Sequence, residues 1–512
     1  MAFVLIGFMG AGKSTAALEL AGALGAGAKD TDAMLAERFG HSLAQEFEQR
    51  GEAAFRAQEE ELVLELLARA GDHDVLALGG GSVLSPRVQE ALASHVTVLL
   101  DVDPAVAWER VRGDGERPLA GEREAFVTLH EQRRALYESL ADVVFEGCAP
   151  GSYARAARAL SALAREAPPG VKMLWASASS GEYPVYIGRG LLPALDALWP
   201  FDRARSRAFC VTDRTVGALY AAELDVDEMF AIEPGEEHKT LADAQLVWSA
   251  LVEAGATRAD HVVALGGGVV GDLAGFCAAT YQRGIPVVQV PTTLVAQVDS
   301  AYGGKTGVDL PMAKNYVGAY HQPAAVFTDL DTLATLPAEE LAAGWVEVLK
   351  TGLIAGGELW QTVAAGQDAD ERAIVRCVRT KLATVAADER DGGRRQALNL
   401  GHTVGHGIEA ASGYARYRHG EAVGLGLLAA LRLSGQPQLR ALVAELLAAR
   451  GLPRTLDEAV ELEDVMKAVH ADKKRLAGEQ VPFVLVREPG AVEHGCKVGE
   501  GEVRAAVREL YA

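Results

Sequence analysis

Gly7-Phe-Met-Gly-Ala-Gly12-Lys13-Ser14-Thr15 decides how the first part of this chain folds. It follows the apolar run Phe3–Ile6, which predicts a β-strand, and the chain after it is expected to be helical. A glycine-rich loop between a strand and a helix lets backbone N–H groups at the helix start bind phosphate oxygens. We expect Lys13 to neutralise the outer phosphates and Ser14 to bind Mg²⁺. The stretch therefore predicts a nucleoside triphosphate site, formed by Gly10, Ala11, Gly12, Lys13, Ser14 and Thr15.

The length and the charge of the chain limit what it can be. At 512 residues it is too long for one ordinary domain, so we expect about two to four. The net charge of −21 argues against nucleic acid or an acidic membrane as a partner. The five cysteines are scattered without a CxxC pair, and no apolar stretch reaches transmembrane length. We therefore expect a cytoplasmic protein that acts on small molecules.

Strand-like runs alternate with helical stretches, which predicts parallel α/β domains. The clearest break is Arg165-Glu-Ala-Pro-Pro-Gly170, because a double proline and a glycine end the preceding helix. Apolar strands are expected at Ala208–Thr212, His261–Leu265 and Val287–Val290, and after about Asp331 the chain is mostly helical. We therefore predict a phosphate-loop domain at residues 1–166, a linker at 167–171, an α/β nucleotide-binding subdomain at 172–331 and an all-helical subdomain at 332–512.

Polar residues and glycines beyond the loop indicate a second ligand in the first domain. Asp30-Thr31-Asp32 stands where a second strand would end, and Gly79-Gly-Gly81 follows the strand Val75–Leu78. Three arginines suit an anionic ligand, namely Arg56, Arg117 and Arg134. Each feature alone is an ordinary helix cap, tight turn or surface arginine. Together, across residues 1–166, they resemble the shikimate kinase family.

The resemblance implies a role for each of these residues. Asp30 would help Ser14 to hold Mg²⁺, and Asp32 would contact the acceptor hydroxyl as general base. The shikimate carboxylate and ring would be bound by Arg56, Arg134, Gly79, Gly80 and Gly81. Lys13 and Arg117, the latter from a lid, would stabilise the transferring phosphoryl group, because this chemistry needs mainly positioning and charge neutralisation. One departure is Ala135, where the family usually has proline, and we expect little consequence.

Glycines and lysines mark a further ligand site in the second half. Gly266-Gly-Gly268-Val-Val-Gly271-Asp272 follows a predicted strand, and alone it is weak evidence for pyrophosphate binding. Lys305 and Lys314 stand in a stretch of otherwise low charge. Such lysines suit a pocket that binds an anion.

Three histidines and a carboxylate predict a metal site. Glu347 and Lys350 are one helical turn apart, and His402 and His406 are four residues apart, so each pair shares one face of a helix. His419 follows, and all three histidines fall within eighteen residues amid glycines. From spacing alone, both His402 and His406 could reach one ion. Ligands from separated segments suit a catalytic zinc that keeps open positions for substrate.

From about Met173 to the C-terminus the chain resembles 3-dehydroquinate synthase, with several motifs in the family's order and spacing. The resemblance implies that Zn²⁺, or Co²⁺, is bound by Glu347, His402 and His419. It places around NAD⁺ the residues Asp213, Glu236, Lys239, Gly267, Gly268, Val269, Gly271, Asp272, Thr292, Thr293, Lys305, Lys314 and Thr335. It places around the substrate Arg283, Asp299, Lys305, Lys314, Asn315, Lys350, Lys381, Arg395, Asn399, His406 and Lys473 or Lys474. Departures at Trp345-Val346 and Thr351 affect only local packing.

The implied reaction converts 3-deoxy-D-arabino-heptulosonate 7-phosphate to 3-dehydroquinate and phosphate. NAD⁺ would transiently oxidise C5 while the metal polarises its oxygen, phosphate would leave, and the returned hydride and an aldol closure would complete the ring. NAD would therefore act catalytically. The residues expected to take part in the chemistry are Arg283, Asp299, Lys305, Lys350 and His406. The resemblance also implies a homodimer formed through this half.

Alternatives from other classes are weaker. A metal-dependent polyol dehydrogenase would not need the cations Arg283, Lys305, Lys314, Lys350, Lys381 and Arg395. Other sugar-phosphate cyclases are expected to lack the Arg395/Asn399 pair. Another small-metabolite kinase is less consistent with Asp32, Arg56 and Arg134 together. A non-catalytic nucleotide sensor or scaffold would have no use for an acceptor base such as Asp32.

Overall fold

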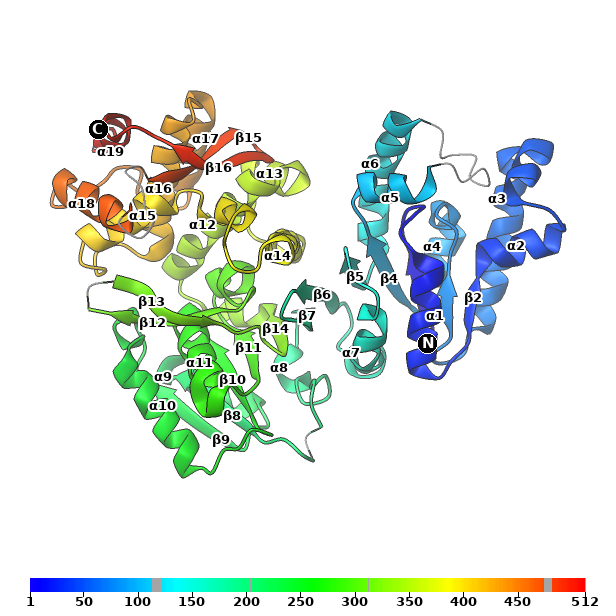
Figure 1. The fold of residues 1–512 in the computed structure, drawn as a ribbon, viewed down its shortest axis with the longest axis horizontal. Helices are drawn as coiled ribbons and strands as arrows, with labels where there is room; N and C mark the ends of the chain where they lie inside the picture. The colour runs from blue at the N-terminus through cyan, green and yellow to red at the C-terminus, as the bar shows by residue number, and fades with distance from the viewer. Residues whose placement is uncertain (113–121, 203, 312, 474–480, 512) are drawn as a thin grey trace. The chain divides into compact units, whose positions relative to one another are not determined.

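The computed structural model describes residues 1–112, 122–202, 204–311, 313–473 and 481–511, with the side chains of residues 472 and 473 excepted. The contacts divide the chain into two compact units. The first comprises Met1–Ser177 and Glu182–Phe201, and the second comprises Ala178–Gly181 and Asp202–Ala512. Each unit is an α/β structure in its own right (Figure 1).

The first unit contains a mainly parallel sheet with the strand order β2-β3-β1-β4-β5-β6-β7. Its strands are β1 (Phe3–Ile6), β2 (Ala28–Asp30), β3 (Val75–Ala77), β4 (Val96–Asp101), β5 (Val143–Glu146), β6 (Lys172–Ala178) and β7 (Gly181–Gly188). Its helices are α1 (Lys13–Leu24), α2 (Thr31–Phe39), α3 (Leu43–Arg69), α4 (Pro86–Leu92), α5 (Pro104–Val111), α6 (Arg123–Leu140), α7 (Ser152–Glu166) and α8 (Leu191–Ala194). The first strand is central and fully buried, so the loop that follows it leaves the middle of the sheet at its carboxyl edge.

The predicted linker at residues 167–171 connects α7 to β6. Strand β6 pairs in parallel with β5, with Val143 opposite Met173, so the sheet of the first unit continues past the linker. The boundary at this point therefore stays a prediction.

The second unit begins with a parallel sheet of order β14-β11-β10-β8-β9. Its strands are β8 (Ala208–Asp213), β9 (Glu228–Ile232), β10 (His261–Gly266), β11 (Val287–Pro291) and β14 (Ala325–Asp329). The helices α9 (Arg214–Tyr220), α10 (Leu241–Glu253) and α11 (Gly268–Thr280), the π-helix η5 (Ala296–Ser300) and the hairpin β12 (Lys305–Leu310)–β13 (Ala313–Tyr320) accompany the sheet. The three predicted strands correspond to β8, β10 and β11. Helix α11 is almost wholly apolar and forms the centre of the core with β10 and β8.

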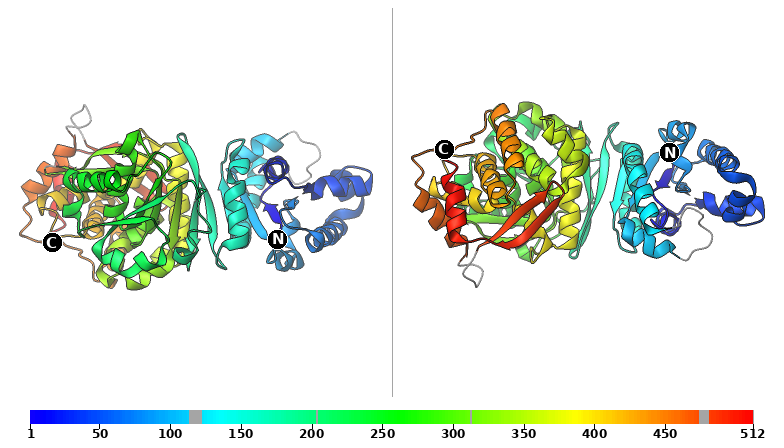
Figure 2. Two further views of the ribbon diagram at one scale, coloured as in Figure 1. Left: turned by 90° about the horizontal axis from the view of Figure 1, so that it is seen from below. Right: turned by 90° about the horizontal axis from the view of Figure 1, so that it is seen from above.

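The rest of the second unit is mostly helical, as predicted. Its helices are α12 (Ala338–Ala355), α13 (Gly357–Ala364), α14 (Glu371–Ala387), α15 (His402–Ala411), α16 (His419–Leu433), α17 (Pro437–Ala449), α18 (Leu462–Lys473) and α19 (Glu500–Arg508). It is not all-helical, because β15 (Pro482–Glu488) and β16 (Ala491–Lys497) form an antiparallel hairpin that packs against α12 and α16 (Figure 2). The apolar run Pro482–Val486 of β15 buries Phe483, Val484 and Val486, and this hairpin corrects the prediction of an all-helical subdomain.

Glycines let three of these helices approach one another at backbone distance. A Cβ atom at Gly420 of α16 would lie 1.9 Å from the carbonyl oxygen of Ala343 in α12. A Cβ atom at Gly426 would lie 2.0 Å from the carbonyl oxygen of Gly401, which precedes α15. Because real Cβ atoms do not approach oxygen so closely, α16 can contact both neighbours only without side chains at these positions. Among the described helices, none combines the length and the apolar character that a membrane crossing requires.

Candidate active sites

In the first unit, the glycine-rich loop joins β1 to α1 with left-handed backbone at Gly10 and Gly12. A side chain at Gly10 would also collide with the carbonyl oxygen of Ala107, 2.6 Å from a Cβ atom there. Lys13 opens α1, and its ammonium donates to the carbonyl oxygens of Gly7 (2.9 Å) and Phe8 (3.2 Å). No side chain of the described residues caps α1. The loop therefore presents helix N–H groups and one cation together, as phosphate binding requires.

Two residues that were predicted to bind the phosphate-accepting substrate lie at the glycine turn that follows β3. A Cβ atom at Gly79 would lie 2.6 Å from Oδ1 of Asp32, and one at Gly81 would lie 2.1 Å from Nη1 of Arg56. Arg56 is held there by Glu59, whose Oε2 lies 2.6 Å from Nη1. The structure thus brings the carboxylate of Asp32 and the guanidinium of Arg56 to one turn. Asp30 caps α2 by accepting hydrogen bonds from the backbone of Asp32 and Ala33.

The two neighbouring arginines of α6 have different surroundings. Arg134 is half exposed, and its Nε donates to Glu138 at 3.0 Å. Arg133 is buried, and its Nη1 lies 3.5 Å from the carbonyl oxygen of Gly80, which also accepts from Tyr137. Because Arg133 and Tyr137 are four residues apart, they share the face of α6 that meets the glycine turn. The structure therefore places Arg133 at the turn, in the position that we expected for Arg134.

This arginine could have been found from the sequence. The buried residues of α6 are Phe126, His130, Arg133 and Tyr137, a spacing of four, three and four residues that marks one helix face. The predicted lid arginine, Arg117, lies outside the described residues.

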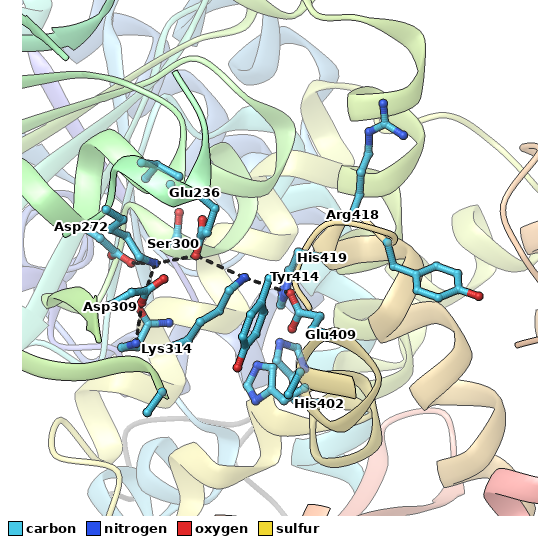
Figure 3. A pocket seen from close by; sticks show the side chains of 18 of the residues that line it. Glu236, Asp272, Ser300, Asp309, Lys314, His402, Glu409, Tyr414, Arg418 and His419 are labelled. Carbon is cyan, nitrogen blue, oxygen red and sulfur yellow. Dashed lines mark hydrogen bonds and ion pairs between the residues drawn. The ribbon is translucent and has the colours of Figure 1, made fainter. Parts of the chain in front are cut away.

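The second unit contains a cavity of about 2490 Å³. Its wall runs from the glycine-rich turn between β10 and α11, at Gly267 and Gly268, to the histidines of α15 and α16 (Figure 3). Every residue that lines it belongs to the second unit. The cavity is thus large enough to take a dinucleotide and a second small molecule together.

Three candidate metal ligands meet at one end of this cavity. Glu347 comes from the middle of α12, while His402 and His419 are the first residues of α15 and α16. Nε2 of His402 lies 3.8 Å, and Nε2 of His419 lies 3.4 Å, from Oε1 of Glu347. The backbone contacts of Gly420 and Gly426 bring these three helices together. His406 does not join this set but belongs with Glu409 and His419 to a second group that could hold an ion.

The surroundings of Glu347 and His402 fit a bound cation. Glu347 is completely buried, its Oε2 is ion-paired with Lys350, and its Oε1 faces Nε2 of His402 and of His419. Burial opposes its ionisation, but the charge of Lys350, 2.5 Å away, holds its pKa at about 2. Burial and the charge of Lys350 lower the pKa of His402 to about 3, so its imidazole is neutral. An ionised carboxylate and two imidazoles are the donors of a catalytic zinc site with an open position.

Two lysines contact one partly buried carboxylate, and one of these lysines also contacts Glu347. Asp299, in the π-helix η5, lies between Lys350 of α12 and Lys381 of α14. Burial raises the pKa of Asp299, but the two ammonium groups outweigh it and hold the pKa well below its ordinary value. Burial and the charge of Lys350 lower the pKa of Lys381 although Asp299 opposes the shift. Asp299 thus contacts both cations of this cluster, and Lys350 also contacts Glu347.

The predicted nucleotide residues surround the turn at the start of α11. A Cβ atom at Gly267 would lie 2.9 Å from Thr293, and one at Gly268 would lie 3.1 Å from Oγ of Ser300. Oγ1 of Thr292 is buried without a hydrogen-bond partner among the described residues. No described side chain caps α11, and Gly267, Gly268 and Val269 at its start line the cavity, an arrangement that suits a phosphate site.

Opposite charges alternate from this turn to the metal ligands. Lys239 lies 3.3 Å from Asp272 and 3.1 Å from Glu236. Lys314 of β13 lies 3.3 Å from Glu236 and 3.3 Å from Glu409 (Figure 3). Burial raises the pKa of Asp272 to about 6 even though Lys239 counteracts it.

The remaining predicted residues divide into two groups. Those that line the cavity are Asp213, Val269, Lys305, Asn315, Asn399 and His406. Those that do not line it are Gly271, Arg283, Thr335 and Arg395. Arg395 is fully buried and donates to the carbonyl oxygens of Gly303 and Glu389, whereas Arg283 is exposed. Lys473 ends α18, its side chain is not described, and Lys474 lies outside the described residues.

Sequence reasoning missed Glu409, Ser300 and Asp391 in the cavity wall. Glu409 stands seven residues after His402 and three after His406, a spacing that puts all three on one face of α15. That spacing was the available signal. No sequence signal could have identified Asp391, because its ion pair with Lys305 joins residues far apart in the chain.

Three family models match the chain. The model described as shikimate kinase matches residues 9–163. The models for the N-terminal and C-terminal parts of 3-dehydroquinate synthase match residues 229–343 and 344–475. The matches therefore follow the chain in the order that the two resemblances predicted.

Similar proteins and solved structures agree with this division. The 3-dehydroquinate synthase of Symbiobacterium thermophilum is 45% identical over 335 residues, which are 60% of this chain and 92% of that protein. The 3-dehydroquinate synthase of Saccharophagus degradans is 43% identical over 342 residues, 63% of this chain and 94% of that protein. The 2-epi-5-epi-valiolone synthase ValA of Streptomyces hygroscopicus, solved with NAD⁺ and Zn²⁺, has a TM-score of 0.59 and 28% identity, covering 65% of this chain and 98% of that one.

A 2-deoxy-scyllo-inosose synthase structure has a TM-score of 0.60 at 22% identity, covering 66% of this chain and 100% of that one, which shows the shared fold. The chain belongs to the 3-dehydroquinate synthase family, and it is a fusion that carries a shikimate kinase domain ahead of the synthase.

Proposed function

We propose that this chain catalyses two reactions of one biosynthetic pathway. The first unit would transfer phosphate from ATP, with Mg²⁺, to shikimate. The second would convert 3-deoxy-D-arabino-heptulosonate 7-phosphate to 3-dehydroquinate and phosphate, with catalytic NAD⁺ and a divalent metal. The single observation that carries the proposal is that each unit brings predicted polar residues together around its own glycine-rich turn.

In the kinase, the residues near the glycine turn would bind and orient shikimate. Asp32 would take the proton from the attacking hydroxyl, and Lys13 with Arg117 would neutralise the phosphates. We assign the carboxylate to Arg56 and Arg133 rather than to Arg56 and Arg134. Burial of Arg133 beside Gly80 supports this assignment, because a desolvated guanidinium binds a carboxylate more strongly than an exposed one.

In the synthase, the turn at Gly267 and Gly268 would bind the dinucleotide pyrophosphate, and Glu347, His402 and His419 would hold the metal. NAD⁺ supplies reversible hydride transfer and the metal supplies Lewis acidity when they are bound. ValA, which has a similar fold at 28% identity, binds NAD⁺ and Zn²⁺, and this supports both cofactors. The lysines and His406 would bind the carboxylate and the phosphate of the substrate. A homodimer formed through the synthase part rests on the family resemblance and is tested by light scattering.

The test is a pair of steady-state assays on the purified full chain. We expect shikimate 3-phosphate from shikimate and ATP, and 3-dehydroquinate from the heptulosonate phosphate with only a trace of NAD⁺. Lys13→Ala should abolish the first activity, and His402→Ala should abolish the second, which assigns each activity to its unit. Steady growth of NADH absorbance during turnover would instead indicate a polyol dehydrogenase, and no product in either assay would overturn the proposal.

A further inference from the structure

The two ring nitrogens of His419 face two different carboxylates. Nε2 lies 3.4 Å from Oε1 of Glu347, and Nδ1 lies 3.5 Å from Oε1 of Glu409. Figure 3 shows His419 and Glu409 side by side at the edge of the cavity. The imidazole therefore has one nitrogen turned to the candidate metal ligand and the other turned to a carboxylate of α15.

His402 is oriented in the same way by a different group. Its Nδ1 lies 3.2 Å from the carbonyl oxygen of Leu400, and its Nε2 faces Glu347. A histidine that binds a metal generally donates its other ring N–H to a carboxylate or a carbonyl, which fixes the tautomer and the ring plane. In both histidines, Nδ1 thus has a protein acceptor and Nε2 is left for the metal.

The carboxylate of Glu409 is buried, and its neighbours are a lysine and the imidazole of His419. Its side chain is 3% exposed, and Oε2 is buried without a hydrogen-bond partner among the described residues. Oε1 lies 3.3 Å from the ammonium of Lys314, which lies 3.3 Å from Glu236. A buried carboxylate is costly unless it is paired, so this one is held in a fixed position between a cation and an imidazole.

We propose that Glu409 is a positioning residue that holds His419 in the orientation and tautomer in which Nε2 binds the metal. The carboxylate accepts the Nδ1 proton, so the lone pair of Nε2 points to the ion. The inference rests on the metal site of the proposed function. A separate cation on His406, Glu409 and His419 is the competing explanation, and it is disfavoured because His406 is exposed whereas Glu347 and His402 are both buried.

The experiment measures metal affinity directly, with apoprotein and a chromophoric Zn²⁺ chelator as competitor. Glu409→Ala should weaken Zn²⁺ binding by roughly 10–100-fold, the usual effect of losing such a partner. Glu409→Gln keeps an acceptor oxygen and should recover most of the affinity. The Co²⁺-substituted Glu409→Ala protein should show a changed visible absorption spectrum. Glu463→Gln, which removes a surface carboxylate that pairs with Arg504, is the control for the change in charge.

Two results would overturn the inference. The first is wild-type affinity and an unchanged cobalt spectrum in Glu409→Ala, which would leave Glu409 a role toward substrate alone. The second is a wild-type protein that binds two ions, of which Glu409→Ala loses only the weaker, because Glu409 would then be a ligand of its own site. If the wild-type chain binds no divalent metal, the proposed function fails instead. Should Glu409→Ala not fold, Glu409→Gln and Glu409→Asp are compared with wild type by the same two measurements.

Discussion

The ammonium of Lys350 lies 2.9 Å from Oδ2 of Asp299; Lys350 is fully buried, and the side chain of Asp299 is 18% exposed. Lys381 contacts the other oxygen of the same carboxylate. Removing one member of a buried ion pair is costly because the remaining charge loses its partner. Among the ion pairs of the described residues, a substitution at Asp299 leaves Lys381 without a carboxylate and Lys350 with only Glu347.

We expect Asp299→Asn to lower the free energy of unfolding of the synthase by ~3 kcal/mol and to abolish its turnover. The loss should depend on pH. Without Asp299 the pKa of Lys381, already lowered by burial, falls further. The folded state then binds fewer protons than the unfolded state, so stability rises with pH up to the pKa of an unfolded lysine, about 10.4. Urea unfolding between neutral and alkaline pH measures this slope.

The control is Asp299→Asn combined with Lys381→Met, which removes one charge of each sign. The double variant should regain free energy of unfolding, and this free energy should no longer rise with pH. It should remain inactive. Equal stability of Asp299→Asn and wild type at neutral pH would contradict this account.

The two arginines of α6 should behave differently in the kinase. Arg133→Lys keeps the charge but loses the bidentate fork, so the KM for shikimate should rise by at least about tenfold with little change in the KM for ATP. Arg134→Lys, the matched control one residue away, should stay within about twofold of wild type in both. Initial rates with each substrate varied separately decide the matter. A large rise in the KM for shikimate in Arg134→Lys but not in Arg133→Lys would instead support Arg134 as the residue that binds the carboxylate.

Local patterns predicted most of the fold and many of the residues that meet at the two candidate sites, because a strand, a glycine turn and a helix start are encoded by adjacent residues. The features that these patterns did not predict depend on how a helix is rotated about its axis or on contacts between residues far apart in the chain. The choice between Arg133 and Arg134 depends on which face of α6 meets Gly80. His402 and His406 share a face of α15, but of the two only His402 groups with Glu347 of α12 as a candidate metal ligand. The ion pair of Lys305 with Asp391 and the hairpin β15–β16 depend on tertiary packing that spacing does not encode.

Three histidine variants separate metal ligands from their neighbours. His402→Ala and His419→Ala should purify with little metal, since each loses an imidazole that faces Glu347. His406→Ala should keep close to one ion per chain and turn over slowly. Elemental analysis of the folded proteins measures this. A metal-free His406→Ala beside a metal-replete His419→Ala would show that the ion uses the second group of residues instead.

The two activities should be separable by mutation. Lys13→Ala removes the cation that folds over the phosphate loop, so it should abolish kinase turnover. The synthase rate of the same protein should stay within about threefold of wild type, because each site has its own polar groups. Both rates are measured on one preparation of the full chain. Loss of both activities in a folded Lys13→Ala protein would show that the sites are coupled.

Gly426→Ala should destabilise the synthase and weaken its metal binding together. The added methyl group would meet the Gly401 carbonyl oxygen, so α15 and α16 must move apart, at a cost of ~1–3 kcal/mol. Gly424→Ala on the same helix is the control, because the nearest atoms to its methyl group would be side-chain atoms, of Leu447 at 3.2 Å and of Val346 at 3.8 Å. Thermal unfolding with and without Zn²⁺ measures both effects, and equal behaviour of the two variants would refute the explanation.

The backbone contacts of α16 also bear on how this enzyme could be redesigned. A directed-evolution library for a different metal would normally vary the residues whose side chains surround the ion. Here the spacing of the ligands is set by positions that have no side chain, Gly420 and Gly426, and any substitution there shifts two ligand-bearing helices at once. Such a library should therefore keep these glycines fixed and vary only Glu347, His402 and His419. A change of metal preference would then result from different donor atoms, while the positions of the three ligand-bearing helices stay the same.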